Sequence, residues 1–206
     1  MTLAAVRLTV LALTGLAAGA LTARAVLPEA RERLLPADRV KISGEALIGG
    51  PFTLVDPAGK TVTDQELRGR TMLVVFGAVA APDATAAALQ VLSSALARLG
   101  AKAANVVPVL IVVDGEHEPP ERLARVVEGF SPRPMALTGN VEQIERVITA
   151  YRVPGIRHGE DLESLTRHKI FNAPPIYVMG PDGRYRGHLS FAAGAEAVAA
   201  SLAGML

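Results

Sequence analysis

Residues 71–85 form a predicted strand-to-helix turn, a place where side chains can carry redox or metal chemistry. The apolar run Thr71–Val75 predicts a buried strand, and the alanine-rich stretch that begins at Asp83 predicts a helix. A helix N-terminus stabilises a thiolate at such a turn. The chain, however, contains no cysteine. Its residues therefore supply no thiolate for nucleophilic attack, disulfide exchange or metal binding, which excludes a thiol oxidoreductase.

The turn resembles the metal-binding turn of the Sco/SenC copper-chaperone family, which reads Phe-Gly-Phe-Thr-x-Cys-Pro-Asp-x-Cys-Pro. Phe76-Gly77 and Pro82-Asp83 match this pattern in register, whereas the two cysteine positions hold Ala81 and Thr85. Further matches follow in the family's order, at residues 48–56, 59–63, 107–114, 130–133, 137–139 and 176–183. Because the ordered matches cover roughly residues 42–190, the chain is identified as a member of this family.

The resemblance also implies where the third copper ligand of the family would lie. In the family a histidine stands just before the strand that ends in Pro-Asp-Gly, and counting back from Ile176 places Asn172 at that position. Copper(I) prefers soft thiolate ligands with imidazole, and asparagine is a poor donor for it. With Ala81, Thr85 and Asn172 at the three ligand positions, we expect a degenerate site, no bound copper cofactor and no catalytic activity.

The alternative is a substitute copper site built from histidine and methionine. His158 and His168 lie near the segment that approaches the family's site, and Met135 and Met179 are available as soft ligands. Met179 falls in a predicted strand, which favours a place in the core instead. Around His117 the acidic residues Asp114, Glu116, Glu118 and Glu121 predict a solvent-exposed loop rather than a metal site.

Pro174 occupies a second position of structural interest. In thioredoxin-like proteins a cis-proline stands at the start of the strand that faces the reactive turn, and Pro174 falls at that place in this chain. X-Pro bonds are the ones that tolerate the cis form. We hypothesise that the Ala173–Pro174 bond is cis and stiffens the loop, with an ordinary trans bond as the alternative.

The order of predicted elements indicates an α/β protein with a thioredoxin-like fold, in which helices flank a central mixed sheet behind an N-terminal hairpin. Asp64 is expected to cap a short turn, and Asn140 with Gln143 resembles a capping box. The expected elements are a hairpin at 52–62, strands at 71–75 and 106–113, helices at 83–99, 119–127 and 140–151, a hairpin at 176–189 and a helix at 193–205.

The N-terminal residues differ in character from the rest of the chain. Residues 8–23 carry no charge, and Arg7 and Arg24 bracket them. As a helix this run spans about 24 Å, somewhat less than the ~30 Å hydrocarbon core of a bilayer, and flanking arginines can snorkel. We expect residues 1–27 to be a membrane anchor, with a cleaved signal peptide as the alternative. We expect a charged linker at 28–44 and a Sco/SenC-type domain at 45–206 to follow. The anchor would lie in the inner membrane, and the domain would face the periplasm.

The resemblance therefore implies a membrane-anchored Sco-like protein linked to assembly of the copper centre of cytochrome c oxidase. Its expected role is that of a non-catalytic binding protein whose partners are respiratory oxidase subunits or another copper chaperone. The alternative is a copper carrier that uses the substitute histidine and methionine site. The formal net charge of +1 and the lack of a basic stripe give no reason to expect nucleic acid.

Overall fold

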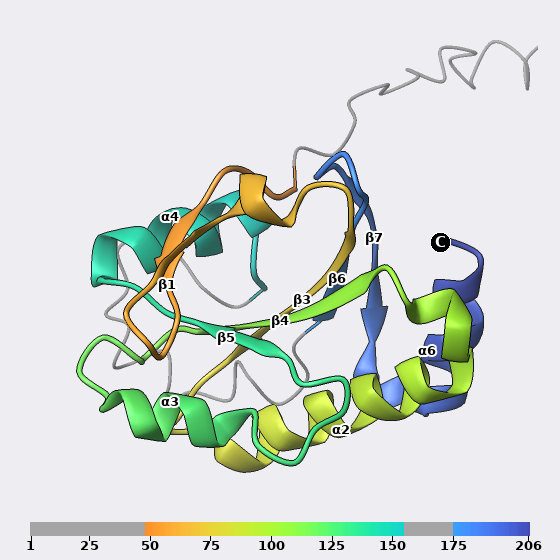
Figure 1. Cartoon of the computed structure of the whole chain (residues 1–206), viewed down its shortest axis with the longest axis horizontal. Helices are drawn as coiled ribbons and strands as arrows, with labels where there is room; N and C mark the ends of the chain where they lie inside the picture. The colour runs from red at the N-terminus through yellow and green to blue at the C-terminus, as the bar shows by residue number, and fades with distance from the viewer. Residues whose placement is uncertain (1–47, 155–174) are drawn as a thin grey trace, which may run out of the picture. The chain divides into compact units, whose positions relative to one another are not determined.

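A five-stranded mixed sheet lies at the centre of the protein, as the computed structural model shows for residues 48–154 and 175–206 (Figure 1). Its strands run in the order β5-β4-β3-β6-β7. The first three in that order are parallel, and the last two are antiparallel to their neighbours. The strands are β3 Thr71–Gly77, β4 Val106–Val112, β5 Met135–Leu137, β6 Pro175–Met179 and β7 Tyr185–Ser190.

Strands β3 and β4 are apolar along nearly their whole length because helices or a hairpin cover both of their faces. Side chains alternate between the faces with a period of two. Met72, Val74 and Phe76 of β3 point into one cluster of core residues, whereas Leu73 and Val75 point into the other. All five are at most 1% exposed.

Among the described residues, helices α2, α3 and α6 cover one face of the sheet, and helix α4 lies on the other (Figure 1). The first set comprises α2 Pro82–Leu99, α3 Pro120–Val126 and α6 Gly194–Ala203. The opposite face carries α4 Val141–Tyr151 and the hairpin of β1 Thr53–Val55 and β2 Thr61–Thr63. Because β3 and β4 are parallel and joined through α2, their carboxyl ends meet at one edge of the sheet.

Local signals account for where several elements begin. The expected capping box at α4 is confirmed: the Asn140 side chain accepts from the Gln143 N–H at 2.9 Å, and the Gln143 side chain accepts from the Asn140 N–H at 2.9 Å. The Gln143 amide also donates to the Thr53 carbonyl at 2.9 Å, which links the helix to β1. Helix α2 starts with Pro82 in its first position, where a missing N–H costs nothing.

One expectation about local structure was wrong, and one strand was not predicted. Thr63, not Asp64, caps the short 3₁₀ turn at Asp64–Leu67, in a reciprocal arrangement with Glu66. Asp64 is instead buried and accepts from the Phe52 N–H at 3.2 Å and the Arg68 guanidinium at 3.1 Å. Strand β5 was not expected, because three residues are too few to establish an alternating pattern.

The helices of residues 48–154 and 175–206 are too short or too polar for any of them to cross a membrane. The expected anchor at 1–27 and the expected linker at 28–44 lie outside the described residues.

Candidate functional site

The turn that follows β3 is held by a carboxylate from the end of β4. Asp114 accepts from the Val79 N–H at 2.7 Å with one oxygen and from the Ala80 N–H at 2.9 Å with the other. Hydrogen bonds to an ionised acceptor are the shorter and stronger kind. Asp114 reaches the turn because Gly77 and Val112, at the ends of β3 and β4, are paired neighbours in the sheet.

A second fastening of the turn comes from Thr85 in the first turn of α2. Its side chain is 1% exposed, and its hydroxyl oxygen lies 3.2 Å from both the amide nitrogen and the carbonyl oxygen of Ala78. The helix packs so closely here that a Cβ at Gly77 would lie 2.8 Å from Thr85 Cγ2 and 2.9 Å from Leu110 Cδ1. A methyl group at position 77 would therefore force the Thr85 and Leu110 side chains to shift.

The two predicted ligand positions that the structure describes carry no suitable donor for copper(I). Ala81 is the residue before α2, is partly buried, and accepts from the Thr85 N–H at 3.2 Å through its carbonyl. Its methyl group cannot coordinate a metal, and the Thr85 hydroxyl is already bonded to Ala78. Copper(I) requires soft ligands, so these residues do not fit it.

The other predicted site residues cannot be placed in this arrangement. Asn172, Pro174, His158 and His168 lie outside the described residues, so the third ligand position, the cis bond and the substitute site remain predictions. Within residues 48–154 and 175–206, no group of three or more histidine, cysteine, aspartate or glutamate side chains is placed to hold a metal ion.

The two histidines that are described lie far apart in the sequence and in different settings. The His117 side chain is 92% exposed and lies 3.9 Å from a Glu116 carboxylate oxygen. His188, on β7, is exposed and shares a hydrogen bond with the Tyr185 hydroxyl. The predicted core position of Met179 is confirmed, since it is 1% exposed.

The acidic loop expected around His117 is only partly a solvated loop. Glu116 and Glu121 are exposed as expected, whereas Asp114 is half-buried and bonds the turn after β3. Its role was missed because its partners lie 35 and 34 residues away along the chain. The available signal was its place directly after a buried parallel strand, where the carboxyl ends of neighbouring strands form ligand sites in α/β proteins.

Phe76, which matches the family motif, serves the core and not the turn. Its ring forms edge-on contacts with Tyr151 and Tyr177 at centroid distances of 5.4 and 5.7 Å. The two tyrosines contact each other edge-on at 5.4 Å. Burial raises the pKa of Tyr177 to about 12, and burial together with the nearby Asp64 carboxylate raises the pKa of Tyr151 further.

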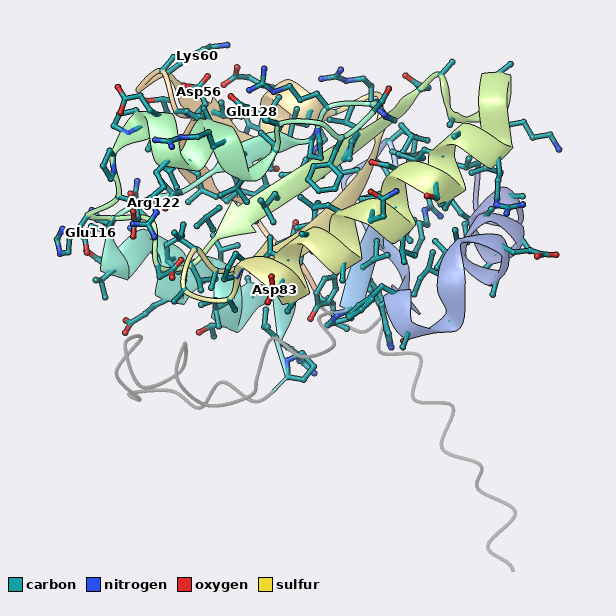
Figure 2. All side chains as sticks on the ribbon, turned by 90° about the horizontal axis from the view of Figure 1, so that it is seen from below. Asp56, Lys60, Asp83, Glu116, Arg122 and Glu128 are labelled. Atoms are coloured by element: carbon teal, nitrogen blue, oxygen red, sulfur yellow. The ribbon has the colours of Figure 1, made fainter. Side chains whose placement is uncertain are left out.

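A groove of about 730 Å³ adjoins the turn on the side of α3. Ala78, Val79, Pro82 and Ala86 line one side of it, and Val126 and Phe130 line the other. Arg122, Arg125 and Glu128 complete the lining with charged groups. Figure 2 shows Asp83 at the start of α2, with Arg122 and Glu128 well separated along α3 and the residues after it.

Comparisons with known proteins relate this arrangement to one family. The family model SCO1/SenC matches residues 40–206. The human Protein SCO1 homolog, mitochondrial, is 32% identical over 200 residues, which are 94% of this chain and 64% of that protein. The chain thus spans less than two thirds of the human relative's length.

Solved structures agree with the family model and with the fold. The structure of Bradyrhizobium japonicum ScoI with copper bound matches with 32% identity and a TM-score of 0.59, covering 77% of this chain and 99% of that one. The thioredoxin domain of a thiol-disulfide oxidoreductase from Bacteroides vulgatus matches with 14% identity and a TM-score of 0.50, covering 73% and 92%. The latter likeness concerns the fold alone, which is α/β and thioredoxin-like as expected. By its family model and its relatives, this chain is a member of the SCO1/SenC family.

Proposed function

We propose that this chain acts in the assembly of the copper centre of cytochrome c oxidase as a non-catalytic binding protein that does not itself carry copper. The family relationship supports the link to oxidase assembly. The chemistry of the turn supports the binding role: where the family motif has two cysteines, this chain has a methyl group and a buried, hydrogen-bonded hydroxyl. Its partners would be oxidase subunits or another copper chaperone.

Copper(I) titration of the purified full chain tests the copper-free part of this proposal. We expect no stoichiometric binding by the parent chain in competition with a copper(I) chelator. The variant Ala81→Cys/Thr85→Cys/Asn172→His should gain one copper equivalent, because it restores thiolate and imidazole donors at the three motif positions. Tight stoichiometric binding by the parent would contradict the proposal, and loss of that binding in His158→Ala or His168→Ala would establish the substitute site.

The link to oxidase assembly needs a test in cells. Deleting the gene should lower cytochrome c oxidase activity and the copper-centre signal in membranes, and the unaltered chain should restore both. The Ala81→Cys/Thr85→Cys variant, which regains the two cysteines of the motif, should be tested beside the unaltered chain. The comparison shows whether the thiols increase the oxidase activity and copper-centre signal that are restored. Full oxidase activity and a full copper signal in the deletion strain would contradict the proposed role.

We also propose that residues 1–27 anchor the chain in the inner membrane, with the domain that follows facing the periplasm. The uncharged run at 8–23 between Arg7 and Arg24 supports this arrangement. The full chain should resist extraction by alkaline carbonate and stay with the membrane fraction. Release by carbonate, or a mature N-terminus near Ala25, would contradict the anchor.

A further inference from the structure

The groove beside the turn has apolar walls, and the side chains of residues 48–154 and 175–206 leave it open. Pro82 and Ala86 are exposed on the α2 side, and Val126 and Phe130 are half-buried on the other side. The groove lies at the carboxyl ends of the parallel strands β3 and β4. In open α/β sheets this is the edge at which ligands bind.

The arginine side chains along the groove differ in whether a carboxylate pairs with them. Arg122 forms an ion pair with Glu118 at 3.3 Å, which neutralises it in part. Arg125, one turn further along α3, donates only to the backbone carbonyl of Glu121 at 3.3 Å. Among residues 48–154 and 175–206 its guanidinium has no carboxylate partner. Arg133 adds a third guanidinium beside α3, donating to the Ala124 carbonyl at 3.5 Å.

We propose that this groove binds a peptide segment of a partner protein that carries apolar side chains next to a carboxylate. The apolar side chains would pack against Ala86, Val126 and Phe130, and the carboxylate would pair with Arg125. An arginine can hold a carboxylate through two parallel hydrogen bonds, which fixes orientation as well as adding affinity. This inference rests on the proposed function, because it supplies the surface by which a copper-free member of the family acts.

A bound peptide, rather than an anionic membrane surface, suits the distribution of charge. Glu128 lies in the same groove, three residues after Arg125, and would repel an anionic lipid headgroup there. A peptide can place its carboxylate at Arg125 and keep uncharged or basic side chains near Glu128. The groove therefore selects for one orientation of the bound segment.

Selection from a phage-displayed library of random peptides, with the full chain in lipid nanodiscs as target, identifies what the groove accepts. The variant Ala86→Glu serves for counter-selection, because it fills the groove and adds a negative charge at an exposed position. Peptides that bind the parent but not this variant should share apolar residues and an aspartate or glutamate. Replacing that acidic residue by its amide should weaken binding, and so should added salt.

Charge reversal at single positions then tests the pairing. Arg125→Glu should weaken binding of the best peptide by about tenfold or more, as expected when an arginine contact at an interface is lost. Arg98→Glu, an equal change of charge at the exposed far end of α2, should leave the affinity unchanged. Circular dichroism of both variants checks that each is folded.

Several outcomes would overturn the proposal. These are a library that yields no groove-dependent peptide, a best peptide whose acidic residue is dispensable, and equal binding by the parent and Arg125→Glu. Self-association of the chain that Ala86→Glu abolishes would assign the groove to a second copy instead. If the groove fails while gene deletion still lowers oxidase activity, the docking surface is wrong and the assembly role stands; if deletion has no effect, the assembly role itself fails.

Discussion

The hydroxyl group of Thr85 is fully used inside the protein, which gives it a measurable structural role. Thr85→Val keeps the shape of the side chain but leaves the buried Ala78 N–H without its acceptor. The free energy of unfolding should fall by about 1–3 kcal/mol in urea denaturation. Thr85→Ser keeps the hydroxyl and loses a methyl group, so hydrogen exchange at the Ala78 amide should accelerate in the valine variant and not in the serine variant. Equal protection in both would contradict this role.

The carboxylate of Asp114 should slow the exchange of two amides that lie in a loop. Val79 and Ala80 both donate to it. In Asp114→Ala their hydrogen exchange should be at least about tenfold faster, which corresponds to about 1.4 kcal/mol in the opening equilibrium. Glu116→Ala, which removes an exposed acid from the same loop, is the control and should leave these amides unchanged. Similar exchange rates in the parent and Asp114→Ala would show that the carboxylate does not hold the turn.

The packing of α2 on β3 depends on the missing side chain at position 77. Gly77→Ala should destabilise the protein by about 1–3 kcal/mol, because the new methyl group meets Thr85 and Leu110. In combination with Thr85→Ala, part of that loss should return, so a double-mutant cycle should give a coupling energy of about 0.5–3 kcal/mol. Gly204→Ala is the control, since its nearest neighbour would be at an ordinary 3.6 Å. Strict additivity of the two changes would contradict the steric explanation.

The elements differ in how well the sequence predicts them, and the difference has a physical basis. Strands β3 and β4 and helix α4 were predicted because their signals are local: apolar runs, helical spacing and the Asn140–Gln143 capping box. Strand β5 is too short to produce a pattern. At the site, the motif predicted the turn between β3 and α2, and the substituted ligand positions stay a prediction, whereas the Asp114 contacts depend on strand pairing between distant segments. The groove, formed by α2 and α3 together, likewise has no local signal.

The protein as a whole should lose stability at high pH because of its buried tyrosines. Burial raises the pKa of Tyr177 to about 12 in the folded state, from a usual value near 10. Because the pKa is higher in the folded state, the folded protein holds the tyrosine proton more tightly than the unfolded chain does. The contribution of the neutral Tyr177 hydroxyl to the free energy of unfolding is therefore complete below pH ~10 and is lost as the pH rises toward ~12. The urea midpoint should therefore fall across that range. Tyr177→Phe has no such proton to lose and should show a shallower decline; equal slopes would contradict the assignment.

The contrast between Ala81 and Thr85 has a consequence for how such a chain changes over generations. Ala81 is partly buried and packs against the core cluster that contains Phe76, but its side chain forms no hydrogen bond, so an apolar replacement of similar size should cost less folding free energy there than at position 85. Position 85 admits only a small side chain that can bond to Ala78. Lineages that have lost the cysteines should therefore vary more at position 81 than at position 85, where threonine or serine should be kept. Sequencing further cysteine-less relatives checks this; large or charged residues at 85 as often as at 81 would refute it.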